Sequence, residues 1–228
     1  MEYRIIHEDA FPLIECKLRQ GESIKAESDA MVSMAGTLDI RGSMDRNILG
    51  GLARRFLAGE SFFFQTITAS RGPGTVLLGH PAPGGIVDVT LDGTYNLRVQ
   101  KDGFLAATPG IEIDTTIQNL AQGLFSREGF FVLNIRGRGT VFLSSFGAIH
   151  AINLEQGEEV IIDNGHLVAW PDYMHYRIEK ASSNGWISSL VSGEGLVCRF
   201  TGPGVVLIQT RKPQAFSTWL RSMLPTSN

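Results

Sequence analysis

Apolar and polar residues follow the same order at three places along the chain. At each place a Gly-x-Gly step opens a run of β-branched and aliphatic residues, and the segments 71–78, 136–143 and 201–208 align without gaps at a spacing of 65 residues. An extended apolar segment leads into each pair of glycines. The pattern predicts a strand, a tight turn and a second strand, which is a β-hairpin. The glycines that define the three turns are Gly72, Gly74, Gly137, Gly139, Gly202 and Gly204.

A second element precedes each of these predicted hairpins. An acidic residue, a small residue and two large apolar residues recur at 60–63, 128–131 and 194–197. Before each acid, apolar residues recur at helical spacing within 44–57, 117–125 and 186–191, which predicts three short helices. The positions that define this repeat motif are Glu60, Phe62, Glu128, Phe130 and Glu194.

A third element and a final helix complete the pattern. Segments 93–109 and 157–171 both run as strand, Asp-Gly or Asn-Gly turn, strand and proline, and 21–36 is the expected first copy. After the last repeat, Phe216, Trp219, Leu220, Met223 and Leu224 recur at helical spacing between Pro213 and Pro225. Proline is suited to the first turn of a helix and ends a helix at the other side, so a helix is predicted over 213–225. We expect this helix to pack across one end of the β body.

These elements predict a mostly β fold built from three copies of one module. The chain is expected to form a single unit over 1–228, with approximate repeats 3–85, 86–148 and 149–212. A module of this size has too little apolar area to fold alone, so the three modules are expected to share one core around a pseudo-threefold axis.

Composition narrows the class of protein. Apolar residues make up 43% of the chain and charged residues 19%, which is typical of a globular protein. The net charge of −3 does not favour a polyanion partner, and we do not expect nucleic-acid binding. Cys16 and Cys198 are too few for a disulfide framework, and the start of the chain has no signal-peptide pattern, so a cytoplasmic location is expected.

One stretch resembles a known family. The segment 50–91 contains a Gly-Glu-Ser-Phe-Phe motif after a short apolar stripe, then the first Gly-x-Gly run and a Pro-Gly-Gly-Ile step. It resembles the altered inheritance of mitochondria protein family, and the resemblance extends over roughly residues 3 to 212. It implies a double-stranded β-helix like that of the tryptophan RNA-binding attenuator protein. It brings no catalytic residues, because the bacterial members have no established activity.

Candidate chemical sites each have a simpler explanation. His7, His80, His150, His166 and His175 contain no His-x-His pair, so no metal is expected, although His166 and His175 lie at a spacing that could bring them together across a hairpin. The equivalent acids Glu60, Glu128 and Glu194 form either a carboxylate ring or three turn caps, and the caps are favoured. Arg71, Arg136 and Arg138 at the glycine turns are interpreted as solvated charges rather than an anion-binding nest.

Other sites are not supported by the sequence. Cys198 lies between apolar neighbours and is expected to be a buried, inert thiol. No Gly-x-Ser-x-Gly elbow or phosphate-binding loop is present. The stripe at 48–57 with its paired arginines could bind an anionic membrane surface, but a helix packed on the β body is favoured.

The sequence therefore favours a non-enzymatic assembly or binding module without a cofactor, with scaffolding or membrane association as its role. A homo-oligomer is expected, with a protein partner or a membrane surface as further partners, and the sequence does not identify a small-molecule ligand. The alternative is a metal-dependent enzyme on a cupin-like β-helix.

Overall fold

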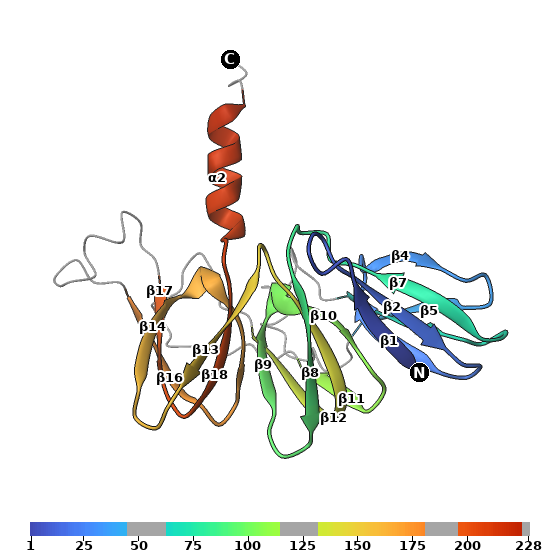
Figure 1. Ribbon diagram of the computed structural model, residues 1–228, viewed down its shortest axis with the longest axis horizontal. Helices are drawn as coiled ribbons and strands as arrows, with labels where there is room; N and C mark the ends of the chain where they lie inside the picture. Colours follow the sequence, from blue (N-terminus) through green and yellow to red (C-terminus); the bar gives the residue numbers. More distant parts are fainter. Residues whose placement is uncertain (45–62, 115–131, 181–195, 225–228) are drawn as a thin grey trace.

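The computed structural model describes residues 1–44, 63–114, 132–180 and 196–224, and in these residues the fold is mostly β with one α-helix (Figure 1). The first third of the chain contains β1 (Glu2–Ile6), β2 (Leu13–Leu18), β3 (Ser23–Glu27), β4 (Met31–Met34), β5 (Asp39–Met44), β6 (Phe63–Thr68) and β7 (Gly74–Leu78). The second third contains β8 (Ile86–Asp92), β9 (Leu97–Gln100), a 3-10 turn at Lys101–Gly103, β10 (Phe104–Ala107), β11 (Ile111–Asp114) and β12 (Val132–Ser144). The last third contains β13 (Ile149–Leu154), β14 (Glu159–Asp163), a 3-10 turn at Asn164–His166, β15 (Leu167–Pro171), β16 (His175–Lys180), β17 (Leu196–Thr201), β18 (Gly204–Gln209) and α2 (Pro213–Met223).

The same antiparallel pairing order recurs in each third of the chain, which we call modules 1, 2 and 3. In module 1, β7 pairs with β2 and β4, and β6 pairs with β3 and β5. In module 3, β18 pairs with β13 and β15, and β17 pairs with β14 and β16. In module 2, the long strand β12 is the central strand of both sheets. Its first half pairs with β9 and β11, and its second half pairs with β8 and β10. Each module is therefore two three-stranded sheets, and β1 adds one further strand beside β2.

Alternation of apolar and polar residues directs one face of each strand inward. In β2, Ile14, Cys16 and Leu18 are buried while the residues between them are not, and Ile24 and Ala26 do the same in β3. Because side chains alternate across a strand, the two sheets of module 1 enclose these residues in one cluster. Modules 2 and 3 have a cluster each.

The modules lie side by side in a row (Figure 1). The buried residues form three clusters, one for each module, rather than a single core. The arrangement around one shared core that the sequence led us to expect is therefore not confirmed, and neither is the double-stranded β-helix.

The Gly-x-Gly segments are not hairpin turns, and this prediction was wrong. The strands on the two sides of each segment belong to the two different sheets of their module, and in module 2 they are halves of one continuous strand. Each segment carries the chain across from one sheet to the other. Gly137 shows why glycine is used there: its φ is +113°, and a Cβ atom would overlap the backbone carbonyl of Gly110.

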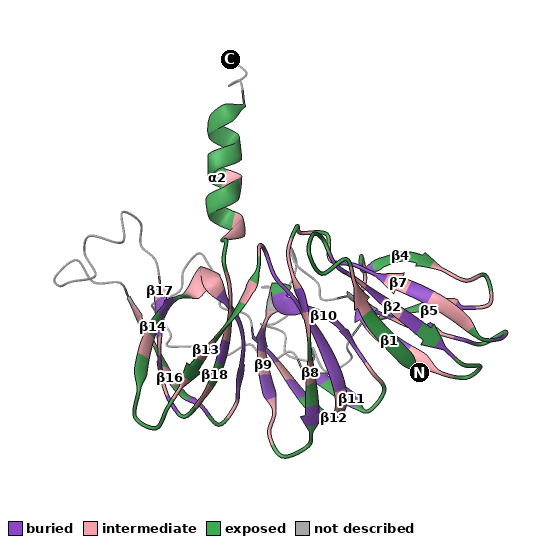
Figure 2. Cartoon of the chain, viewed as in Figure 1, coloured by how far each residue is buried: buried purple, intermediate pink, exposed green. Residues whose placement is uncertain are grey.

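The C-terminal helix is present but does not pack as expected. α2 begins at Pro213 and ends at Met223, close to the predicted bounds. None of its residues is buried, and it projects away from the sheets (Figures 1 and 2). The expectation that it covers one end of the β body was therefore wrong. The three short helices expected within 44–57, 117–125 and 186–191 lie outside the described residues, apart from Met44, which ends β5.

Candidate assembly interface

Neighbouring modules are joined by one type of strand pairing, used twice. β10 of module 2 pairs with β3 of module 1, with Ala106 opposite Ala26. β15 of module 3 pairs with β9 of module 2, with Ala169 opposite Val99. In both junctions, the third strand of one module extends the sheet of the module before it.

A β-bulge in this third strand makes the junction tight. The register against the central strand shifts between Phe104 and Ala106 in module 2 and between Leu167 and Ala169 in module 3. The extra residue is Leu105 in one case and Val168 in the other, and these side chains are 0% and 1% exposed. Leu105 belongs to the core cluster of module 1, and Val168 belongs to the cluster of module 2. The bulge therefore places an aliphatic side chain in the core of the preceding module.

Module 1 carries the same strand and the same bulge, but no module precedes it. In β4 the register against β7 shifts between Met31 and Ser33, so Val32 is the counterpart of Leu105 and Val168. Val32 is 56% exposed. Within the described residues, β4 pairs with β7 on one side and with no strand on the other.

Module 3 carries the complementary open edge. β14 corresponds to β3 and β9, which receive the third strand of the next module, and within the described part of the chain β14 pairs with β17 alone. Its Ile161 is 40% exposed, whereas its counterparts on the paired strands are Lys25 and Arg98. The row of modules thus has an open β4 at one end and an open β14 at the other. Their counterparts in the internal junctions, β10 with β3 and β15 with β9, are paired with each other. Unpaired edges present free backbone N–H and C=O groups.

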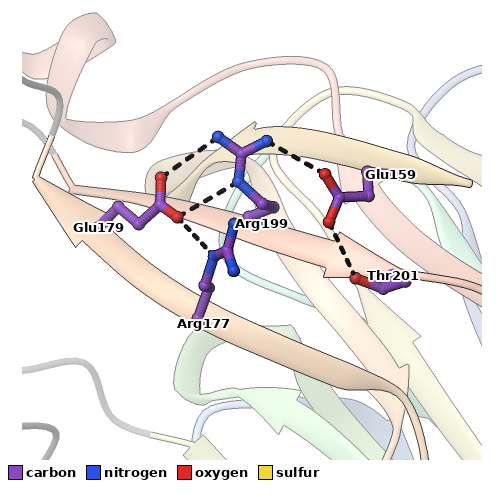
Figure 3. A network of polar contacts seen from close by, with 5 residues as sticks. All are labelled: Glu159, Arg177, Glu179, Arg199 and Thr201. Atoms are coloured by element: carbon purple, nitrogen blue, oxygen red, sulfur yellow. Dashed lines mark hydrogen bonds and ion pairs between the residues drawn. The ribbon is translucent and has the colours of Figure 1, made fainter.

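A network of charged side chains covers the outer face of the sheet that ends in β14 (Figure 3). The Arg199 guanidinium lies between Glu179, at 3.2 Å, and Glu159, at 3.5 Å, and Arg177 donates to the same Glu179 carboxylate at 2.6 Å. Hydrogen bonds from Arg199 and Arg177 lower the pKa of the Glu179 carboxyl group. Glu159 lies on β14 itself, so this network fixes polar groups beside the open edge.

The motif residues expected as a functional site divide into two groups. Glu60, Phe62, Glu128, Phe130 and Glu194 lie outside the described residues, so their roles stay predictions. The glycines lie at the sheet crossings described above. Arg71, between β6 and β7, bonds to Asp39 of β5 at 2.9 Å, and Arg136 bonds to Glu112 across the neighbouring strands β12 and β11 at 2.9 Å.

Among the described residues, no group of three or more His, Cys, Asp or Glu side chains is placed to hold a metal ion. His166 Nδ1 lies 2.6 Å from the Gln209 carbonyl oxygen, and His175 lies on β16 opposite Thr201. Burial lowers the pKa of His80, whose Nδ1 accepts a hydrogen bond from the Ala82 N–H group. These histidines therefore have structural contacts of their own.

The two cysteines are buried free thiols. Burial raises the pKa of Cys16 and of Cys198 to about 12. A thiol with so high a pKa is protonated at neutral pH and is a poor nucleophile. The expectation that Cys198 is a buried thiol is confirmed.

The two open edges were not predicted from the sequence. The segments 31–34, 104–107 and 167–170 form equivalent bulged strands, and they differ in whether a module precedes them. Among the described helices, none is both long and apolar enough to cross a membrane.

Comparison with known proteins gives a family and a set of relatives. The family model described as Mitochondrial biogenesis AIM24 matches residues 3–211. An uncharacterized protein of Streptococcus pyogenes serotype M6 is 33% identical over 235 residues, which cover 100% of this chain and 93% of that protein. The X-ray crystal structure of a Streptococcus pyogenes protein superposes with a TM-score of 0.78 at 31% identity, covering 98% of this chain and 99% of that one.

Two fungal proteins named altered inheritance of mitochondria protein 24 also match. The protein of Verticillium alfalfae is 28% identical over 161 residues, which cover 70% of this chain and 41% of its own length. The protein of Aspergillus flavus is 21% identical over 253 residues, which cover 90% of this chain and 60% of its own length. The chain thus spans less than two thirds of either fungal relative.

Proposed function

Because this chain belongs to the Mitochondrial biogenesis AIM24 family and its bacterial relative is named only as uncharacterized, we propose a function from its geometry: a non-enzymatic scaffold that assembles head to tail. In this assembly, β4 of one copy pairs with β14 of the next. The observation that carries the proposal is the junction used twice within the chain, which leaves β4 and β14 as the matching pair of open edges.

The register of the contact follows from the internal junctions. Ser33 is the counterpart of Ala106 and Ala169, and Ile162 is the counterpart of Ala26 and Val99. Ser33 of one copy therefore lies opposite Ile162 of the next, and Met34 lies opposite Ile161. β4 and β14 are at opposite ends of the row of modules (Figure 1), so the two edges meet between copies and not within one chain.

Val32 supplies the apolar part of the contact. By analogy with Leu105 and Val168, it enters the core of module 3 in the neighbouring copy, beside residues such as Ile162. Burial of a valine side chain contributes about 1.5–3 kcal/mol. That range corresponds to about a 10- to 150-fold change in the dissociation constant of each contact.

A contact between two different surfaces is heterologous. Such contacts generate a ring when the rotation between copies closes, and a filament when it does not. Either product displays many copies of the same outer surface, which is the property that a scaffold needs.

Light scattering coupled to gel filtration tests the proposal. The wild-type protein is expected at a multiple of the single-chain mass of 24.9 kDa. Val32→Asp places a charge at the contact and is expected to reduce the mass to that of one chain. Val205→Asp is the matched control, because Val205 is a valine that is 38% exposed and lies on β18, which is already paired on both sides with β13 and β15.

The control is expected to assemble like the wild type. A wild-type mass of one chain at micromolar concentration would overturn the proposal. Assembly of the Val32→Asp protein to the wild-type mass would overturn it as well, since a carboxylate cannot enter the core of the neighbouring copy without a large desolvation cost.

A further inference from the structure

The C-terminal helix has an apolar face that the described part of the chain leaves largely uncovered. Phe216 packs against Phe146 at a ring distance of 5.2 Å and fixes the base of the helix. Trp219, Leu220, Met223 and Leu224 lie beyond this contact, and Trp219 is 52% exposed. Most of α2 is exposed (Figure 2). An isolated helix of 11 residues is barely stable in water, so a surface that covers these side chains would stabilise α2.

The polar and apolar residues of α2 are fully separated. At 100° per residue, Phe216, Trp219, Leu220 and Met223 fall on one half of the helix, whereas the other half carries Gln214, Ser217, Thr218, Arg221 and Ser222. Aromatic and aliphatic residues on one face with arginine on the other are typical of helices that lie in the plane of a membrane surface.

Charge distinguishes this segment from the rest of the protein. Residues 211–228 contain Arg211, Lys212 and Arg221 and no acidic residue, so the remainder of the chain carries a net charge of −6. Lys212 is bonded to Asp163 at 2.7 Å, whereas Arg211 and Arg221 have no acidic partner among the described residues. A basic helix on an acidic body is complementary to an anionic surface.

The described body offers no apolar surface that matches the helix. Its exposed large apolar side chains lie on several separate elements, and those on β4 and β14 belong to the edges assigned above to assembly. These residues are Tyr3, Phe11, Met31, Val32, Ile161, Tyr173 and Val205. A second copy therefore does not provide, in its described residues, a groove for four large helix side chains.

We propose that α2 binds the surface of an anionic lipid bilayer, with Trp219, Leu220, Met223 and Leu224 in the interface and Arg221 toward the headgroups. The family model matches residues 3–211 and ends before the helix, so the family match itself assigns no role to α2. The docking of one helix does not depend on assembly. The strength of binding rests on the proposed function, because a head-to-tail assembly presents several such helices at once.

Vesicle flotation with the full chain tests this inference. The probes are vesicles of phosphatidylcholine alone and of phosphatidylcholine with phosphatidylglycerol. The wild-type protein is expected to float with the anionic vesicles, and Trp219→Ser/Leu220→Ser is expected to weaken that binding at least about tenfold. Phe11→Ser removes an aromatic side chain outside the helix that is more exposed than Trp219, and this control is expected to bind like the wild type.

Two further measurements separate the possible outcomes. The tryptophan fluorescence of the wild type, to which Trp219 contributes as one of three tryptophans, is expected to shift to shorter wavelength on anionic vesicles. Val32→Asp is expected to show the same shift at a higher lipid concentration. Wild-type protein that neither floats nor shifts would overturn the inference, as would unchanged flotation of the Trp219→Ser/Leu220→Ser protein. A fall of that variant to the mass of one chain without lipid would instead place α2 between copies and overturn the lipid assignment, while leaving the test of Val32 unaffected.

Discussion

Single residues in this protein are explained by what their counterparts do in the other modules. Val32, Leu105 and Val168 occupy the same bulge, yet Val32 is exposed and the other two are buried. Burial of a residue therefore depends on whether a module precedes it, which no local sequence pattern encodes. The burial of Cys198 could be predicted from its apolar neighbours, because it depends on the pattern of its own strand.

The buried thiols of Cys16 and Cys198 give the protein a specific sensitivity to alkali. Their pKa rises from 9.0 to about 12 on folding, so above pH 9 the unfolded chain loses protons that the folded chain keeps. The contribution of the protonated thiols to the free energy of unfolding is fully present below pH 9. It falls as the pH rises toward 12, by about 1.4 kcal/mol per thiol for each pH unit. Urea unfolding at pH 8 and pH 10 measures this loss.

The matched control replaces both thiols by alanine. Cys16→Ala/Cys198→Ala is expected to lower the free energy of unfolding at pH 8, because it leaves small cavities, but to flatten its fall between pH 8 and pH 10. Equal slopes for the variant and the wild type would show that the thiols are not the cause.

At the scale of elements, the sequence identified the strands better than their partners. The runs after the three Gly-x-Gly steps are strands β7, the second half of β12 and β18, as expected. Their interpretation as hairpins failed because a glycine step between two apolar runs has the same pattern whether the chain turns back or crosses to another sheet. Pairing partners are set by tertiary contacts, here the approach of Gly137 to the turn at Gly110.

Because Gly137 lies so close to Gly110, adding a methyl group at Gly137 is expected to lower the free energy of unfolding strongly. Gly137→Ala is expected to destabilise the protein by about 3 kcal/mol or more, because the residue has a positive φ and its Cβ overlaps the Gly110 carbonyl. Gly36→Ala is the control: Gly36 has an ordinary φ and open space around it, so a change within about 0.5 kcal/mol is expected. Thermal unfolding of both variants measures the difference, and equal midpoints would refute the role assigned to the crossing.

At the scale of the whole molecule, the family and the mostly β class could be predicted, and the family model and the related crystal structure confirm them. The arrangement of the modules in a row could not. The sequence shows three similar segments, but it does not show whether the first and third modules meet. That question decides whether β4 and β14 are paired with each other within the chain or left open for the proposed contact between copies.

Cysteine cross-linking across the proposed contact tests the central claim most directly. Met34→Cys/Ile161→Cys places thiols on β4 and β14 at positions that would lie opposite each other in the proposed contact. Residues opposite each other on paired antiparallel strands have Cα atoms about 4.5–5.5 Å apart, which a disulfide can bridge. Met34→Cys/Val205→Cys is the control, since Val205 is exposed on β18 away from the edges. After mild oxidation, non-reducing gels are expected to show covalent multimers for the first pair and single chains for the control. Single chains for both pairs, or equal multimers for both, would contradict the pairing of β4 with β14.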